Sequence, residues 1–239
     1  MKLFSVLAVL FLASVFASAY SDRAYTLDVQ VNPDGGAHVI EKSLLNLDTA
    51  SEIEAFEFVL REGKTTLADW QKFSRNIRYH TTGSVFGLRI VAAREFATSF
   101  TSASVTLEYD VQNLTQFTQV SSRKTRYDVD MQKIVLGNPG EVSLGQNMIF
   151  VLRLPKDAVR VAVSPNAGVT FLADEQVLRW VGPTAGTWDV VFEREITLAQ
   201  EVQLFFVDAY AALASSAVLW LLLAVVLGLI GYKVLRTPR

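Results

Sequence analysis

The sequence predicts a mainly β protein: an antiparallel β-sandwich ectodomain of one or two subdomains, one short amphipathic helix and a single transmembrane helix. Three observations lead to this prediction. Short runs of alternating apolar and polar residues recur along the middle of the 239-residue chain, and glycine, proline and asparagine separate them. An uncharged run of 24 residues lies near the C-terminus.

The first 19 residues have the three parts of a signal peptide. Lys2 precedes the apolar run 3–16, and Ala17-Ser18-Ala19 supplies small residues at a cleavage site. We therefore expect residues 1–19 to be removed during export, with cleavage before Tyr20. The alternative is an uncleaved N-terminal anchor, although the run is short for a bilayer span of about 20 residues.

Residues 209–232 carry no formal charge and are long enough to cross a hydrocarbon core about 30 Å thick. Tyr210 and Tyr232 bracket this run, at positions where aromatic side chains favour the membrane interface. Three basic residues follow it: Lys233, Arg236 and Arg239. The positive-inside rule then predicts a single-pass protein of the cell membrane with residues 233–239 in the cytoplasm.

Residues 20–137 are predicted to form an N-terminal β-rich subdomain. It begins with a hairpin, because residues 24–31 alternate and the turn residues 32–36 lead into a second strand from Ala37. Further strands are expected over four ranges: Glu52–Leu60, Val85–Ala93, Ser104–Val111 and Tyr127–Met131.

One short amphipathic helix is expected over residues 65–77. Leu67, Trp70 and Ile77 recur at helical spacing, and Thr66 with Asp69 fits a capping box. The segment lacks the dense Lys/Arg face of a membrane-surface helix. Packing against the sheet is therefore favoured.

Residues 138–208 are predicted to form a C-terminal β-sandwich subdomain that begins at the turn Asn138-Pro139-Gly140, although one continuous sandwich is the alternative. Five short β-rich runs follow the turn: Asn147–Leu154, Val159–Val163, Val169–Leu172, Val177–Val181 and Thr187–Glu193. Strand-like sequence continues through Glu201–Val207, so the ectodomain is expected to lie close to the bilayer. Trp70, Trp180 and Trp188 are expected in the core.

Composition excludes several classes of function. The middle of the chain holds all 24 acidic residues but 18 of the 22 basic residues, which gives it a formal charge of −6. Such a surface argues against nucleic-acid binding. The chain has no cysteine, so disulfides, thiolate catalysis and Cys-ligated metals are excluded, and the absence favours a prokaryotic source.

Candidate catalytic residues are few. The chain has only two histidines, His38 in a predicted strand and His80 after the predicted helix. So few histidines argue against a His-ligated metal site or a Ser-His-Asp triad. Asp128 and Asp130 would face the same side of a strand and could bind a cation or act as an acid and base pair. The pairs Glu52/Glu54 and Glu193/Glu195 have the same spacing, and all three pairs are explained as acids on a solvent face.

Two other features concern surfaces. Arg123, Lys124 and Arg126 form a basic cluster, which could contact an anionic partner but is better explained by charge balance with Asp128 and Asp130. Asn113-Leu114-Thr115 is a glycosylation sequon, so Asn113 is a candidate modification site.

Two stretches of the sequence resemble a known group of proteins. They are residues 25–41, which contain the opening hairpin, and residues 154–183, from Leu154-Pro155-Lys156-Asp157 to Arg179-Trp180-Val181-Gly182-Pro183. Both are similar to uncharacterised, membrane-anchored extracytoplasmic β-sandwich proteins common in archaea. The resemblance covers about half of the ectodomain, and it implies the fold and the envelope location but no catalytic residues. The long cytoplasmic portion of many such proteins has no counterpart here, so no signalling role is implied.

The sequence therefore predicts a non-enzymatic envelope protein with no cofactor. Its expected partners are the membrane and other envelope proteins or surface glycans, including a role as accessory subunit of a membrane complex. The alternative is an extracytoplasmic carboxylate- or metal-dependent hydrolase that uses Asp128 and Asp130.

Overall fold

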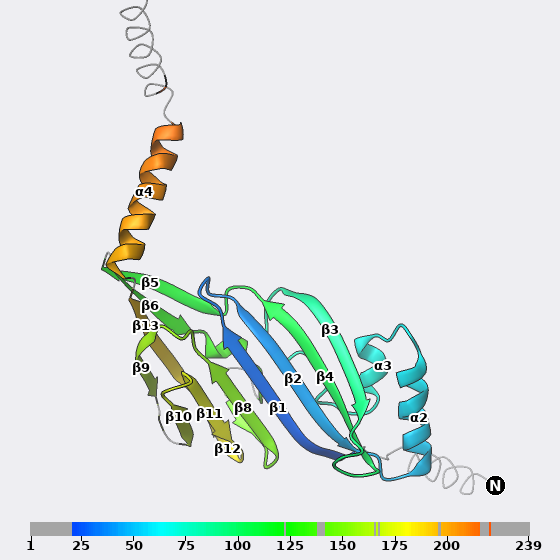
Figure 1. Cartoon of the computed structure of the whole chain (residues 1–239). Coiled ribbons are helices and arrows are strands. Elements are labelled where there is room, and N and C mark those ends of the chain that lie inside the picture. The colour runs from blue at the N-terminus through cyan, green and yellow to red at the C-terminus, as the bar shows by residue number, and fades with distance from the viewer. Residues whose placement is uncertain are drawn as a thin grey trace, which may run out of the picture. The chain divides into compact units, whose positions relative to one another are not determined.

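A computed structural model of the chain describes residues 21–121, 123–137, 142–164, 166, 168–195, 197–215 and 220 (Figure 1). The predicted signal peptide and cytoplasmic tail lie outside these residues, as does the predicted transmembrane segment after residue 215 apart from Trp220. No helix within the described ranges is both long and apolar enough to cross a membrane. Contacts divide the chain into two units, residues 1–118 with 126–194 and residues 119–125 with 195–239.

The fold is mainly β, as predicted, and resembles a sandwich built from several sheets. The largest sheet has seven strands in the order β10-β11-β8-β1-β2-β4-β3. Their bounds are Val169–Leu172, Val177–Val181, Met148–Arg153, Ser21–Val31, Ala37–Asn46, Ser102–Val111 and Val85–Arg94. A second sheet has the order β5-β6-β13-β9, with bounds Thr115–Ser121, Lys124–Val129, Asp189–Glu195 and Ala158–Ser164. The short strands β12, Thr184–Gly186, and β7, Val142–Leu144, form a third.

Most of the predicted strands are confirmed. The opening hairpin is β1 and β2, and its turn is held by hydrogen bonds from Asn32 N to Gly36 O (2.9 Å) and from Gly35 N to Asn32 O (3.1 Å). The five predicted C-terminal runs correspond to β8, β9, β10, β11 and β13. The strands β5, β7 and β12 were not predicted, because they are short or lack a regular alternation.

The large sheet is mixed, whereas the sequence predicted an antiparallel arrangement. Strand β8 pairs in parallel with β1, from Tyr25 beside Met148 to Gln30 beside Arg153. Parallel neighbours need a long crossover connection, and more than a hundred residues between β1 and β8 provide it. The predicted boundary near Asn138 therefore falls between strands that share one sheet.

The core lies along one face of this sheet. Alternate residues of β1 are buried there, namely Tyr25, Leu27, Val29 and Val31. Alternate residues of β4 follow the same pattern: Ala103, Val105, Leu107, Tyr109 and Val111. A period of two is what a half-buried strand requires, because successive side chains point to opposite faces.

Aromatic residues fill both ends of the core, and the predicted burial of three tryptophans is confirmed. Trp180 and Trp188 stack with ring centroids 4.8 Å apart, and Phe150 stacks on Trp180 at 5.1 Å. Trp70 packs edge-on against Phe56 at 5.3 Å.

The segment predicted as a strand over Glu52–Leu60 is a helix, α2, Ala50–Arg61. Thr49 caps it: its side chain accepts from Glu52 N (3.2 Å), and the Glu52 carboxylate accepts from Thr49 N (3.0 Å). Phe56 and Val59 are buried at helical spacing. The alternation of apolar and polar residues predicted a strand because Phe58 was counted as part of a buried face, but its side chain is 65% exposed.

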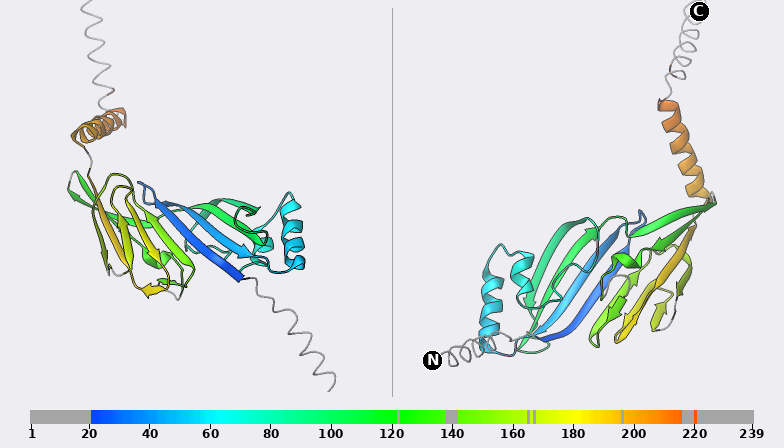
Figure 2. Two further views of the ribbon diagram at one scale, coloured as in Figure 1. Left: turned by 60° about the horizontal axis from the view of Figure 1, so that its bottom comes forward. Right: turned by 180° about the vertical axis from the view of Figure 1, so that it is seen from behind.

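The predicted helix over residues 65–77 is shorter than expected. Helix α3 covers only Leu67–Gln71, and its predicted cap is present, since the Asp69 carboxylate accepts from Thr66 N at 2.9 Å. Beyond it, Phe73 and Ile77 are buried through turns rather than a continued helix. Figures 1 and 2 show α2 and α3 beside the β3 end of the large sheet, so the expected packing against the sheet is confirmed.

A short 3-10 helix, η1, covers Met131–Lys133.

The strand-like segment Glu201–Val207 is also helical. It belongs to α4, Leu198–Ser215. Phe205, Phe206 and Val207 have high strand propensity, but alanine, leucine, glutamine and glutamate surround them and favour a helix.

The cap of α2 gives the first prediction. Thr49→Ala removes the hydroxyl that accepts from Glu52 N, so we expect the free energy of unfolding to fall by about 1 kcal/mol. Urea unfolding followed by circular dichroism measures it. Thr82→Ala is the control, because Thr82 is an exposed loop residue, and an equal loss in both variants would contradict the capping role.

Candidate functional site

Asp128 and Asp130, the predicted acid pair, do not form a catalytic centre with His80. Asp128 forms an ion pair with Arg126 (3.4 Å), and Asp130 lies just after β6 and pairs with Lys133 (3.5 Å). His80 is buried elsewhere, against Glu41. Each aspartate is therefore balanced by a nearby base.

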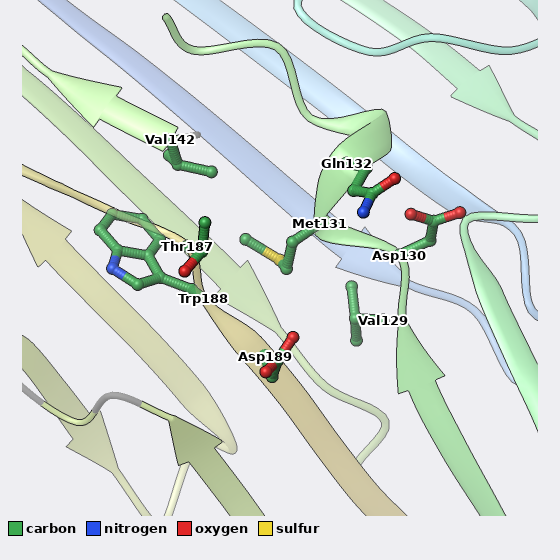
Figure 3. A pocket seen from close by; sticks show the side chains of 8 residues that line it. All are labelled: Val129, Asp130, Met131, Gln132, Val142, Thr187, Trp188 and Asp189. Atoms are coloured by element: carbon green, nitrogen blue, oxygen red, sulfur yellow. The ribbon is translucent and has the colours of Figure 1, made fainter. Parts of the chain in front are cut away.

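Asp130 does line a small pocket, of about 170 Å³, with Gln132, Thr187, Trp188 and Asp189. Figure 3 shows the Met131 side chain extending from η1 toward Thr187 and Trp188. The pocket contains no histidine. No group of three or more His, Asp or Glu side chains in the described part of the chain is placed to hold a metal ion.

The strongest polar cluster surrounds Glu41, on the core face of β2. Tyr25 Oη donates to Glu41 Oε2 (2.7 Å), and His80 Nδ1 lies 2.8 Å from the same oxygen. The other oxygen, Oε1, accepts from His80 N (2.9 Å) and from the hydroxyl of Tyr109. All four residues are at most 2% exposed.

The hydrogen bonds define the protonation pattern of this cluster. Four donors around two carboxylate oxygens match an ionised Glu41, which has acceptors only. Arg78 Nε lies 3.3 Å from His80 Nε2 and donates to it, so Nδ1 carries the imidazole proton, which faces both Glu41 Oε2 (2.8 Å) and Tyr25 Oη (2.7 Å). Because both carboxylate oxygens of Glu41 are used, and the four residues of the cluster are at most 2% exposed, the cluster has no room for a substrate. It is a structural network.

His38 is partly exposed. On the outer face of β2 it lies between Asp110 (2.8 Å) and Glu108 (3.4 Å). Among the glutamate pairs, the solvent-face interpretation is wrong for Glu52, which is buried and serves the cap of helix α2. Glu193 pairs with Arg160 (3.4 Å), and Glu195 pairs with Lys124 (2.7 Å).

The basic cluster is charge-balanced, but largely by partners other than those predicted. Arg126 pairs with Asp128, as expected, whereas Arg123 pairs with Glu201 of α4 at 2.9 Å and Lys124 with Glu195. Distant sequence positions supply these acids, so the sequence could not indicate them.

Asn113, the predicted glycosylation residue, lies in the exposed turn between β4 and β5 with a φ of 56°. Its carbonyl accepts from Lys133 Nζ (2.6 Å). Its side chain is accessible, and the modification stays a prediction.

The best candidate for a binding site is the loop between β3 and β4, residues 95–101, which we call the aromatic loop. Phe96 is 59% exposed and Phe100 is 81% exposed, although the two rings pack edge to face with their centroids 5.7 Å apart. Large apolar side chains held in water are a mark of interaction surfaces.

A nearly buried arginine holds the aromatic loop in shape. Arg94, with a side chain 6% exposed, pairs with Glu57 of α2 (2.8 Å). The same guanidinium donates to the carbonyl of Phe100 and lies 5.0 Å from the Phe96 ring centroid. The loop is therefore tied to α2 by one side chain. Further exposed apolar residues lie on these neighbouring elements: Phe58 and Leu60 on α2, and Phe86, Leu88 and Val91 on β3.

Comparisons with known proteins add little. No protein-family model matches the chain. No curated protein matches it either. Among solved structures, it is similar to the folded domain of LppM from Mycobacterium tuberculosis, with 7% identity and a TM-score of 0.31 over 74% of this chain and 92% of that one. So low a score supports no inference about function.

The Glu41 network makes stability depend on pH. Burial, and next the Glu41 carboxylate, raise the pKa of both Tyr25 and Tyr109 above the usual value. Above about pH 10 the unfolded chain releases these two protons, whereas the folded chain still holds them. The free energy of unfolding therefore falls as the pH rises beyond about 10. In a tyrosinate absorbance titration of the seven tyrosines, we expect these two to ionise only with unfolding. Their ionisation in the folded chain together with the exposed tyrosines would contradict this.

Replacing the carboxylate tests the network directly. In Glu41→Gln, the NH2 group of the new side chain would face the donors that surround the carboxylate, and the buried site offers it no acceptor in their place. We expect the free energy of unfolding to fall by about 3 kcal/mol. Glu108→Gln is the control in the neighbouring strand. It removes a partly exposed partner of Arg89 and should cost less than about 1 kcal/mol. Equal costs would show that burial of Glu41 is unimportant.

Proposed function

We propose that this chain is a single-pass membrane protein whose extracytoplasmic β-sandwich body is not an enzyme and binds another envelope protein through the aromatic loop. The uncharged run 209–232 and the basic residues after it support the anchor and its orientation. The exposed and fixed Phe96–Phe100 pair supports the binding role.

A protein partner is favoured over a glycan by the chemistry of the loop. Phenylalanine offers apolar area but no hydrogen bond, whereas a sugar needs polar partners beside the ring. Rigid aromatic side chains are frequent energetic centres of protein interfaces, since they bury much area at little entropic cost. The Arg94 contacts keep the two rings in place before binding, which lowers that cost further.

The hydrolase alternative has no supporting observation. Within the described residues, Asp128 and Asp130 are ion-paired with bases and His80 belongs to the buried Glu41 network.

The test is comparative co-purification after gentle detergent extraction, read by mass spectrometry. A partner that is recovered with the unaltered chain should be at least tenfold less abundant with the double variant Phe96→Ser/Phe100→Ser. The reason is that a loss of about 1.4 kcal/mol in binding free energy weakens the affinity tenfold. The control is Phe171→Ser/Leu172→Ser, which removes two exposed apolar side chains from β10.

A partner kept by the Phe96/Phe100 variant, or lost equally from both variants, would contradict the assignment of the loop. Thermal unfolding of both variants checks that the fold is intact. A surface glycan recovered in place of a protein would replace the proposed partner class.

A further inference from the structure

Helix α4 has an apolar face that no described residue covers. Leu198, Val202, Phe205, Phe206 and Tyr210 recur at helical spacing along it and are 45–74% exposed. Leu198, Val202, Phe206 and Tyr210 follow one another at intervals of four residues, and Phe205 lies three residues after Val202, so all five share one side of the helix. An apolar stripe of this size in water requires an occupant.

The polar side of the first turns is already occupied. Glu201 pairs with Arg123 at the tip of the β5–β6 hairpin (2.9 Å), and the neighbouring Lys124 pairs with Glu195 just before the helix (2.7 Å). Both ion pairs lie within the smaller unit. They fix which side of α4 faces the hairpin and which side is left free.

The spacing of the free face identifies its geometry. Leu198, Val202 and Phe205 follow the four-three spacing of a coiled-coil seam. In the sequence the same spacing continues without a charged residue through Ala209, Ala212, Ser216, Leu219, Leu223, Val226 and Ile230. Glu201, paired with Arg123, falls outside this seam. Alanine and serine at three successive seam positions allow two helices to approach closely.

We propose that the free face of α4 binds the α4 of a second copy of this chain, as a parallel helix pair that continues into the membrane span. The inference rests on the proposed membrane anchor, which gives every copy the same orientation and so allows only a parallel pair. Two identical seams then face each other about a two-fold axis, as in an isologous dimer.

Lipid is a poorer occupant for this part of the helix. Val202 lies one residue from Glu201, whose ion pair with Arg123 is partly exposed to solvent. Placing the stripe in the hydrocarbon would bring this pair into an apolar medium, where buried charges are costly. A second helix covers the stripe and leaves the ion pair in water.

The chain contains no cysteine, so each introduced cysteine is the only thiol. We would place single cysteines on the full chain at three seam positions, Leu198→Cys, Val202→Cys and Phe205→Cys. Two exposed positions off the seam, Gln203→Cys and Val207→Cys, are controls. Val202 and Val207 form a matched pair, because both are exposed valines of the same helix. Mild oxidation in isolated membranes then joins two thiols into a disulfide wherever two copies meet, and the oxidant takes up the two electrons and the two protons.

Disulfide-linked dimer is expected to be several-fold more abundant for the three seam positions than for the two controls. Equal amounts at all five positions, or no dimer at any, would overturn the helix pair, whether lipid or another protein covers the stripe. Protease treatment of intact cells and membrane fractionation report on the anchor separately. If the chain is recovered in the soluble fraction, the anchor fails, and the same five variants oxidised there still decide whether the helices pair.

Discussion

Strand β1 presents hydrogen-bonding groups along both of its edges, and a strand with a fully buried face must satisfy both. It does so by pairing antiparallel with β2 and parallel with β8. The first pairing is local, since a five-residue turn joins the two strands. The second draws together segments more than a hundred residues apart, and it places Phe150 and Trp180, on which Trp188 stacks, in the same sheet as the opening hairpin. The joint sheet and the packing of its buried aromatic residues both depend on this double pairing.

The same sheet accepts an ionised side chain at its centre. Glu41 occupies a position where the alternation of β2 calls for an apolar residue, between Val39 and Ser43. Two tyrosines and a histidine from three other segments surround it. The carboxylate can accept their hydrogen bonds only if the strands pair in the observed register. A one-residue slip would leave a charge without partners in the core. The network thus favours a single register of β1, β2 and β4.

The sequence predicted the elements in which alternation and turn residues agree. The β1–β2 hairpin and the strands after Asn147 have both signals. Two predicted strands proved to be helices, at α2 and α4, because exposed phenylalanines imitated a buried strand face. In α2, the cap formed by Thr49 and Glu52 was present in the sequence and indicates the helix.

The sites were less predictable than the fold. His80 is a buried residue with all its hydrogen-bonding groups paired, but the sequence did not indicate its partner Glu41, although an acid within an apolar alternation is a visible signal. The fixing of Phe96 and Phe100 by Arg94 depends on Glu57, thirty-seven residues away. The pairs Arg123–Glu201 and Lys124–Glu195 span even longer separations. Only tertiary structure brings such residues together.

The turn that holds Asn113 constrains when a sugar chain could be attached. In the folded protein Leu114 is fully buried, and the hydroxyl of Thr115 points to Gly35 O at 3.3 Å. A transferase that reads Asn-X-Thr must reach the threonine as well as the asparagine. Once β5 has docked beside the β1–β2 turn, that third residue is out of reach. Modification of this sequon would therefore have to precede folding of this part of the chain.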